Sequence, residues 1–574
     1  MTETTPQDPK SPQPQAATFT DNTGRENDFE NLMEKARDHH AQGSFDDAQR
    51  LYRKILESRP EDAEVLSKLG AAMAAHGKFL ESKSILRRAI ENDPELVEAH
   101  INLGNVFQLQ GQLEDAVGQL RRALEINPDQ AAALVNLGNI LLKQGNPEDA
   151  AGSYARALEI EPEFPQALNG LGTALMQQNK GDEAAETFAR ALEISPDQPE
   201  ILCNLGTLLR NQGKYDDAVE TLGKAIALQP KVTEAHINLG NALKSRGDWD
   251  GALDSYQQAL SLEPDNAETH WNNAQVLLML GRFREGWAEY EWRTKCEGFR
   301  SLIWGPGGPT WDGSDLHGKT ILIYSEQGFG DSIQFVRYAQ PLAAMGATVI
   351  VKCPPQLKKL FDTAPGVDRV VTRTDQSAPY HVRASLLGLP RLLNTDLATI
   401  PAAVSYLSPS VAASRNLESG EKRKVGIVWA GSPSHKNDQN RSMSLGHFKP
   451  LLEMEGFAFY SLQAGEQSQD INHFGLSNSI VDLNRNLDDF AATAAVMKEL
   501  DLIISVDTST AHLAGALGKP VWTLLPFVPD WRWLLDRDDS PWYPSMRLFR
   551  QKSPGDWQGV MDTVEPALRQ SLLN

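Results

Sequence analysis

The apolar and small residues in the first half of the chain recur with a period of 34 residues. One position of this period is proline throughout: Pro60, Pro94, Pro128, Pro162, Pro196, Pro230 and Pro264. Three more series share the register, an alanine series that includes Ala116 and two glycine series that include Gly104 and Gly111. We interpret each repeat as two antiparallel helices, with small residues where the helices cross, Gly at the end of the first helix and Pro before the next repeat.

The pattern changes near residue 317, where short apolar, β-rich runs begin to alternate with amphipathic stretches. The alternation starts at TILIYS and restarts at KVGIVWAG, which predicts two Rossmann-like lobes, each with a parallel sheet. The predicted organisation is a disordered tail (1–28), a repeat array of about eight repeats with an atypical last one (29–300), a linker (301–316), an N-terminal lobe (317–415) and a C-terminal lobe (416–574).

Composition and charge narrow the class of protein. The 574 residues include 55 Lys and Arg against 76 Asp and Glu, a net charge of −21, which disfavours general binding to nucleic acid or to an anionic membrane surface. The three cysteines are far apart, so neither a disulfide framework nor a structural zinc site is indicated. No secretory signal and no apolar run long enough to cross a bilayer is evident, and we expect a cytoplasmic protein without membrane insertion.

The repeats resemble the tetratricopeptide (TPR) family, as in INLGNVFQLQGQLEDAVGQLRRALEINP from Ile101 to Pro128. The resemblance covers about residues 29–300. It implies an α-solenoid whose first helices line a concave groove.

Asparagines recur at one position of the first helix: Asn102, Asn136, Asn204, Asn238 and Asn272, interrupted by Gly170. A ladder of amides can donate to and accept from the backbone of an extended acceptor peptide. The alternative is that each amide bonds the adjacent helix.

In the N-terminal lobe, SEQGFGDSIQF is a strand end followed by a glycine-rich turn. Gly328 and Gly330 either approach a ligand or simply permit a tight strand-to-helix turn. Asp331, at the start of the next helix, is a candidate catalytic base, because a helix N-terminus favours the ionised carboxylate.

Two segments of the C-terminal lobe are candidate donor sites. VWAGSPSHKNDQNRS gathers His435, Lys436 and Arg441 after a strand, as the phosphates of a nucleotide sugar would require, or forms a solvated loop. In SVDTSTAHLAGALGKPVW, a strand ends at Asp507 and polar residues precede a helix, which favours phosphate binding. His512 is a ligand contact or a buried capping residue. The residues 531–533 stack on a base or pack the lobes together.

The G-x-G-D turn together with DTSTAHLAGALGKP resembles GT-B glycosyltransferases, in particular the ADP-heptose:lipopolysaccharide heptosyltransferase-like group. The resemblance implies that Asp331 is the catalytic base and that the C-terminal lobe binds the nucleotide sugar. We predict that the donor is bound by Gly328, Gly330, Gly431, His435, Lys436, Arg441, Gln463, Asp507, Thr508, Ser509, Thr510 and His512.

A TPR array joined to a GT-B region resembles protein O-glycosyltransferases, more closely the bacterial flagellin glycosyltransferases of the FlmG type than the O-linked N-acetylglucosamine transferases. The resemblance implies transfer of a sugar to Ser or Thr of flagellin held in the groove, from a CMP-nonulosonic acid, with a UDP-sugar as the other donor. No cofactor is expected. Asp536 and Asp538 match the letters of a metal-binding D-x-D motif but follow a Trp-rich loop, so a metal-independent mechanism is favoured. The alternative function is a TPR interaction scaffold with an inactive GT-B-like domain.

Overall fold

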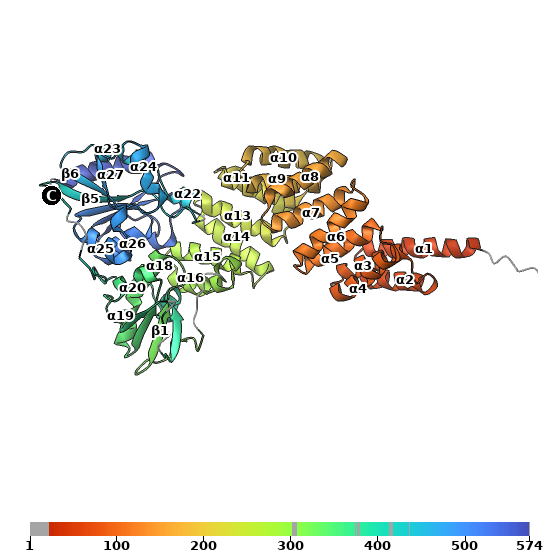
Figure 1. Ribbon diagram of the computed structural model, residues 1–574, viewed down its shortest axis with the longest axis horizontal. Helices are drawn as coiled ribbons and strands as arrows, with labels where there is room; N and C mark the ends of the chain where they lie inside the picture. Colours follow the sequence, from red (N-terminus) through yellow and green to blue (C-terminus); the bar gives the residue numbers. More distant parts are fainter. Residues whose placement is uncertain are drawn as a thin grey trace, which may run out of the picture. The chain divides into compact units, whose positions relative to one another are not determined.

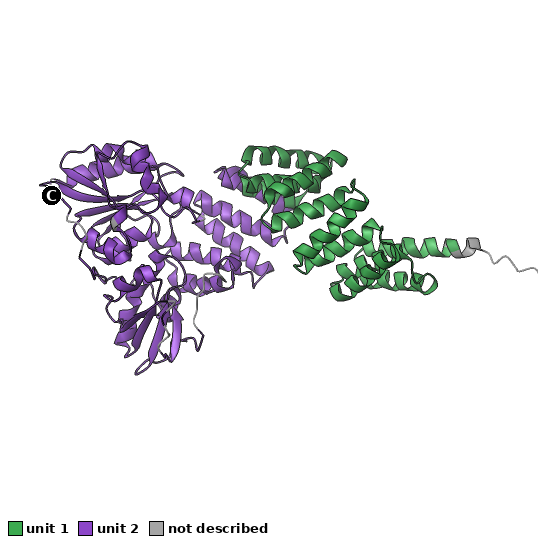
Figure 2. Ribbon diagram, viewed as in Figure 1, with its two compact units in different colours: residues 1–208 green, residues 209–574 purple. Residues whose placement is uncertain are grey.

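The computed structural model describes residues 22–572 except 301–306, 373–374, 376–378, 413–416, 419 and 436 (Figure 1). Most of the predicted tail (1–28) therefore lies outside the described residues, and helix α1 already begins at Asn22. The chain divides into two compact units, residues 1–208 and residues 209–574 (Figure 2). Each unit is described separately below.

Unit 1 is an all-helical stack of antiparallel pairs. Its helices are α1 (Asn22–Ala41), α2 (Phe45–Ser58), α3 (Ala63–Ala75), α4 (Phe79–Asn92), α5 (Val97–Leu109), α6 (Leu113–Ile126), α7 (Ala131–Lys143), α8 (Pro147–Ile160), α9 (Pro165–Gln177), α10 (Gly181–Ile194) and α11 (Pro199–Asn211), which crosses the unit boundary. The period of 34 residues reappears as one helix pair per repeat.

The two glycine series have the roles that their spacing predicts. A Cβ atom on Gly138 would lie 2.7 Å from Cε1 of Tyr154 on the second helix of the repeat, so glycine permits the close crossing. Gly111, just after the first helix α5, has φ +73°, the left-handed conformation that ends helices.

Unit 2 begins with the remaining repeats and continues into the α/β region. Its repeat helices are α12 (Tyr215–Leu228), α13 (Thr233–Arg246), α14 (Trp249–Leu262), α15 (Ala267–Met279) and α16 (Phe283–Tyr290), followed by the 3-10 helix η1 (Glu291–Lys295) and α17 (Glu297–Arg300). With α1 to α11 they make the eight helix pairs that the sequence predicts.

The α/β region contains two sheets whose strands are all parallel. The first sheet has the order β3-β2-β1-β4, from β1 (Thr320–Tyr324), β2 (Thr348–Lys352), β3 (Arg369–Val371) and β4 (Val382–Ser385). The second has the order β10-β9-β8-β5-β6-β7, from β5 (Arg423–Val428), β6 (Phe457–Ser461), β7 (Ile480–Asp482), β8 (Leu502–Val506), β9 (Val521–Leu525) and β10 (Met546–Arg550).

Helices cover these sheets as in doubly wound folds (Figure 1). They are α18 (Phe329–Phe335), α19 (Ala339–Ala344), α20 (Pro355–Phe361), α21 (Leu389–Leu392), α22 (Asp438–Arg441), α23 (Lys449–Leu452), α24 (Asp470–His473), α25 (Phe490–Lys498), α26 (Ser509–Ala516) and α27 (Trp557–Ser571). The predicted fold class, a TPR α-solenoid followed by an α/β region with two Rossmann-like lobes, is confirmed. None of the helices in the described ranges is long and apolar enough to cross a membrane.

The last repeat belongs to the core of the α/β region. Trp287 on α16 is buried in the same hydrophobic cluster as Phe335 of the first lobe and Trp531 of the second. Its indole Nε1 donates to the backbone oxygen of Thr395 at 3.0 Å. The aromatic second helix of the atypical last repeat therefore anchors the array to both lobes.

Candidate functional site

Each parallel sheet has one point at which the strand order reverses, between β1 and β4 in the first sheet and between β5 and β8 in the second. Ligands of open α/β sheets bind in the crevice that forms at such a point, beyond the carboxyl ends of the strands. The three segments selected from the sequence follow β1, β5 and β8. The topology therefore puts all three at the two crevices where a ligand is expected.

Asp331 lies in the first turn of α18, just after β1. Its Oδ2 accepts a hydrogen bond from the backbone N–H of Gly328 at 2.9 Å, and its Oδ1 pairs with the guanidinium of Arg532. Burial raises the pKa of Asp331, and the charge of Arg532 opposes this rise. The carboxylate is thus held in one orientation, on a rigid turn, by groups from both lobes.

Arg532 joins the two lobes at this site; the sequence placed it among residues that could pack the lobes together but did not predict its pairing with Asp331. It lies in the 3-10 helix η7 (Trp531–Trp533) and donates through Nε to Oε1 of Gln334 at 2.5 Å and through Nη1 to Oδ1 of Asp530 at 2.8 Å. The feature in the sequence that could have indicated this role is an arginine between two tryptophans, in a protein with a net negative charge. Its partner Asp331 lies 201 residues away in sequence, which no local pattern reveals.

The tryptophans beside Arg532 pack the lobes together. Trp531 and Trp533 are 3% and 0% exposed. The ring of Trp531 meets that of Trp287 edge-on at 5.1 Å, and the ring of Trp533 stacks on His512 at 5.2 Å. Of the two roles considered for residues 531–533, packing is the one that the structure shows.

The loop after β5 is held against the turn after β8. Arg441 donates through Nη1 to the backbone oxygen of Asp507 at 3.3 Å and through Nε to Oδ1 of Asp438 at 3.3 Å. A Cβ atom on Gly431 would lie 2.6 Å from Nη2 of Arg441, so glycine leaves room for the guanidinium in this position. The two predicted donor segments of the C-terminal lobe are therefore brought together.

His435 is exposed on the same loop, and Lys436 lies outside the described residues. Partial shielding from water lowers the pKa of His435 and the charge of Arg441 lowers it further, whereas Asp530, Asp438 and Asp331 act in the opposite direction. His435 is therefore within electrostatic range of Asp331, across the lobes.

Helix α26 follows β8 and begins in the second crevice. Thr508 precedes it in extended conformation, with its Oγ1 3.1 Å from Oγ of Ser505, and Ser509 and Thr510 are half-buried in the first turn. The first N–H groups of a helix have no intrahelical acceptor and carry partial positive charge, as a phosphate requires. Burial and Asp530 raise the pKa of the adjacent Asp507 to about 6.

His512 and Gln463 face inward. His512 is buried, bonds through Nδ1 to the hydroxyl of Tyr543 at 2.8 Å, and has a pKa that burial holds well below its usual range. The Gln463 amide bonds to backbone groups, accepting from the N–H groups of Trp429 (3.2 Å) and Ala430 (3.0 Å). These contacts fix the two side chains within the C-terminal lobe. Direct contacts of His512 and Gln463 with the donor stay predictions.

The charges of the site are largely balanced. Within the described part of the chain, the cations Arg441 and Arg532 contact or lie near the carboxylates of Asp331, Asp507 and Asp530. These side chains alone therefore do not give the excess of positive charge that was predicted for the donor pocket. In the described ranges, no group of three or more His, Cys, Asp or Glu side chains is arranged to hold a metal ion.

The repeated asparagines are half-buried on their first helices. In unit 1 their amides donate to a side chain on the first helix of the preceding repeat: Asn102 to Ser67 at 3.1 Å, Asn136 to Asn105 at 2.9 Å and Asn204 to Asn169 at 2.9 Å. These three thus bond the adjacent helix, which was the alternative to a peptide-binding ladder. Peptide binding by Asn102, Asn136, Asn204, Asn238 and Asn272 stays a prediction.

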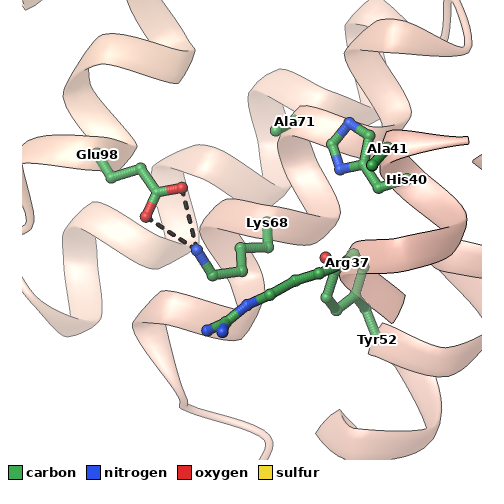
Figure 3. A pocket seen from close by; sticks show the side chains of 7 residues that line it. All are labelled: Arg37, His40, Ala41, Tyr52, Lys68, Ala71 and Glu98. Atoms are coloured by element: carbon green, nitrogen blue, oxygen red, sulfur yellow. Dashed lines mark hydrogen bonds and ion pairs between the residues drawn. The ribbon is translucent and has the colours of Figure 1, made fainter. Parts of the chain in front are cut away.

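Unit 1 also contains a cavity of about 280 Å³, lined by residues that include Arg37, His40, Tyr52, Lys68 and Glu98 (Figure 3). The ammonium group of Lys68 points toward Glu98 and donates to both carboxylate oxygens at 3.2 Å. The cations of this cavity therefore already have acidic partners.

The contact between Gly330 and His512 yields a testable expectation about the lobes. A Cβ atom on Gly330 would lie 2.8 Å from Cδ2 of His512, a ring that Tyr543 and Trp533 hold in place. We expect Gly330→Ala to destabilise unit 2 by about 1–3 kcal/mol, because the rigid ring cannot yield. Chemical denaturation of the full-length protein measures the change.

The matched control is Gly223→Ala on α12, where a Cβ atom meets nothing within 4 Å. There we expect a stability gain of up to about 1 kcal/mol, because alanine favours a helix over glycine. Equal stability changes in the two variants would contradict the tight contact between α18 and α26.

Comparison with known proteins supports the repeat assignment. Models described as tetratricopeptide repeat match residues 39–103, 95–162, 135–199 and 203–260, and a model described as TPR repeat matches residues 240–281. The chain is 31% identical over 328 residues to Protein FlbA of Caulobacter vibrioides, an alignment that covers 52% of this chain and 54% of that protein. The chain thus spans about half the length of this curated relative.

Several solved structures are similar to part of the chain. They include the Cut9-Hcn1 hetero-tetramer of APC/C (20% identity, 46% of this chain, 52% of that chain, TM-score 0.40) and a tetratricopeptide repeat protein from Parabacteroides merdae (17%, 43%, 98%, 0.37). Pseudomonas aeruginosa pilF is 26% identical and covers 37% of this chain and 96% of its own, with a TM-score of 0.33.

Proposed function

We propose that this protein is an O-glycosyltransferase that moves a sugar from a nucleotide-sugar donor to a Ser or Thr hydroxyl of a protein acceptor captured by the TPR helices. The observation that carries the proposal is the joining of Asp331 to the C-terminal lobe through Arg532. Asp331 lies beside the crevice of the first sheet, and the N-terminus of α26 lies at the crevice of the second sheet. In the proposal the two form one site, because transfer requires the acceptor and the phosphate-linked donor to be held next to each other.

The chemistry assigned to each group follows from its position. Asp331 accepts the proton of the acceptor hydroxyl as the oxygen bonds to the anomeric carbon of the sugar. The bond from that carbon to the nucleotide phosphate breaks, and the phosphate keeps the electron pair. The N–H groups of Ser509 and Thr510 stabilise the new negative charge. Arg532 orients Asp331 and limits the rise that burial causes in the pKa of this carboxyl group.

The identity of donor and acceptor rests on the sequence resemblance. Flagellin as acceptor and a CMP-nonulosonic acid as donor are the specific form of the proposal, and a UDP-sugar is the alternative donor. Metal-independent transfer belongs to the same proposal.

One observation favours a second candidate function, a TPR interaction scaffold with an inactive α/β region. The arginines of the site are already matched by carboxylates, and His512 and Gln463 bond inward. A protein that keeps this packing without binding a nucleotide would behave as a scaffold.

Donor binding separates the two functions. Thermal unfolding of the full-length protein is measured with CMP, UDP, GDP and ADP, each with and without Mg²⁺. A nucleotide at about 100 times its Kd stabilises the folded state by about 2.7 kcal/mol. We expect one nucleotide to raise the Tm equally with and without Mg²⁺, and the matching sugar nucleotide to add a sugar mass to flagellin. No shift with any nucleotide would favour the scaffold.

A further inference from the structure

Two basic residues on consecutive repeats of unit 2 have no acidic partner among the residues that the structure describes. Arg210, in the last turn of α11, and Lys244, in the last turn of α13, are 34 residues apart and hold the same position of the repeat. Arg210 donates to Oδ1 of its neighbour Asn211 at 3.0 Å. Among the residues that the structure describes, Lys244 has no hydrogen-bond or ion-pair partner for its ammonium group.

The two cations hold the same position on the first helices of consecutive repeats and are partly shielded from water. Both side chains are only partly exposed, and burial lowers the pKa of Lys244 to about 8, with the charge of Arg210 lowering it further. Burial also lowers the pKa of Arg210. Placing like charges together in a low-dielectric region is unfavourable unless an anion joins them.

This pairing is unusual for the chain. The protein has a net charge of −21, and in the unit 1 cavity Lys68 and Arg37 bond to Glu98 and Glu64 (Figure 3 shows the Lys68–Glu98 pair). Carboxylates are abundant, yet none is within bonding distance of Lys244 in the described residues. The missing counter-charge points to an anion that another molecule supplies.

The surroundings suggest which molecule. On α13, Lys244 follows Asn238 and Asn241 at intervals of three residues, so the three lie along one side of the helix. This is the side that the asparagine series predicts to face the groove. Asn241 is fixed by the hydroxyl of Tyr256, which donates to its Oδ1 at 2.8 Å.

The same end of α13 lies close to the C-terminal lobe. A Cβ atom on Gly247, the residue after α13, would lie 3.5 Å from Cζ of Phe527, in the loop that leads from β9 to Asp530. A peptide bound along this side of α13 would therefore lie next to Arg210 and Lys244 and close to the C-terminal lobe, which contains Arg532.

We propose that Arg210 and Lys244 bind the carboxylate of an acidic side chain in an extended segment of the acceptor polypeptide. The inference deepens the proposed function and rests on its assignment of the TPR helices as the acceptor site. One carboxylate between the two cations removes their repulsion and gains two charge-assisted hydrogen bonds. The acceptor site would thus select an acidic residue near the Ser or Thr that is modified.

The test measures peptide binding without transfer. Two fluorescein-labelled 12-residue peptides of Gly, Ser and Thr, one with two central Glu residues and one with Gln in their place, are titrated with full-length Asp331→Asn protein, and anisotropy gives each Kd. We expect the Glu peptide to bind about tenfold more tightly, as for a partly desolvated charge pair. Arg210→Gln with Lys244→Gln should abolish this preference, and Lys244→Arg should keep it.

The control variant is Lys224→Gln with Lys231→Gln, which removes the same charge from exposed positions of neighbouring repeats and should leave the preference intact. Thermal unfolding shows whether each variant is folded. The inference is overturned if the parent protein does not distinguish the peptides, or if the folded Arg210/Lys244 variant still prefers Glu. It is also overturned if free CMP or UDP displaces the Glu peptide from the two cations, which would assign them to the donor. The binding assay contains no donor, so it does not depend on sugar transfer. If the protein prefers the Glu peptide but cannot transfer sugar, the proposed enzyme activity is wrong and the carboxylate-binding site is still supported.

Discussion

Asp331→Asn is expected to lower the rate of sugar transfer by about 10²–10⁴-fold, the contribution of a positioned general base. Asparagine has almost the same shape as aspartate, and its Oδ1 can still accept the hydrogen bond that the Gly328 N–H donates at 2.9 Å. It cannot take a proton from the acceptor hydroxyl. Intact-mass measurement of the acceptor over time gives the rate, and peptide anisotropy should show unchanged acceptor affinity.

A matched control replaces carboxylates that the fold leaves on the surface. Asp536 and Asp538 are exposed and spell the D-x-D letters in the loop between η7 and β10. Asp536→Asn with Asp538→Asn should leave the transfer rate within about twofold of the parent protein, since neither carboxylate is placed to act. If this control lost activity while Asp331→Asn kept it, the base and the metal-free mechanism would both be wrong.

The acid side of the pH profile should report the same carboxylate. Because burial raises the pKa of Asp331, the proton-accepting form is lost as the pH falls through a value above that of an ordinary aspartate. Arg532 opposes the rise, so Arg532→Gln should move the acid limb of kcat/KM to higher pH as well as lower the rate. An unmoved limb would mean that another group, such as Asp507 with its pKa of about 6, controls it.

Much of the fold could be predicted because its periods are long and regular. The 34-residue register predicts all eight helix pairs, and the predicted apolar runs TILIYS and KVGIVWAG coincide with β1 and β5. The strands that the pattern missed are short or lie at sheet edges, as with β7 at Ile480–Asp482 and β4 at Val382–Ser385. A run of three or four residues gives too few alternations to separate a strand from a loop.

The candidate site could be predicted only in part. Segments that follow strands were found because parallel sheets bind ligands at those ends. Whether a polar side chain faces the crevice or the core is decided by partners distant in sequence. Gln463 turns to the backbone of residues 429 and 430, and His512 to Tyr543. The contact of Arg293 with the first lobe was likewise hidden, because a repeat pattern says nothing about what packs beyond its last helix.

Arg293→Met is expected to lower the stability of unit 2 by about 3–5 kcal/mol, because it leaves a buried carboxylate without its partner. Arg293, in η1, and Glu326, directly beyond β1, are each 2% exposed at the side chain. The guanidinium donates to Oε1 of Glu326 through Nη2 at 2.5 Å and through Nε at 3.1 Å. Its Nη2 also donates to Oγ of Ser385 at 3.1 Å.

These contacts lie at the point where the strand order of the first sheet reverses. Glu326 follows β1 and Ser385 ends β4, so Arg293 inserts from the end of the TPR array into the crevice beside the turn that carries Asp331. Loss of Arg293 should therefore reduce transfer as well as stability, since the turn loses the group that fixes its first residue. Chemical denaturation, followed for the transition of unit 2, measures the stability change.

Two further variants separate the buried charge from general damage. Arg284→Met removes an arginine that is 80% exposed and pairs with Asp396 at 3.6 Å, and it should cost less than about 1 kcal/mol. Arg293→Met with Glu326→Leu removes both buried charges and should recover much of the stability lost in the single variant. If the double variant is stable but transfers sugar poorly, the ion pair serves to position the Asp331 turn. If it recovers both properties, hydrophobic packing alone joins the array to the first lobe, and the charge pair acts only to keep Glu326 neutralised.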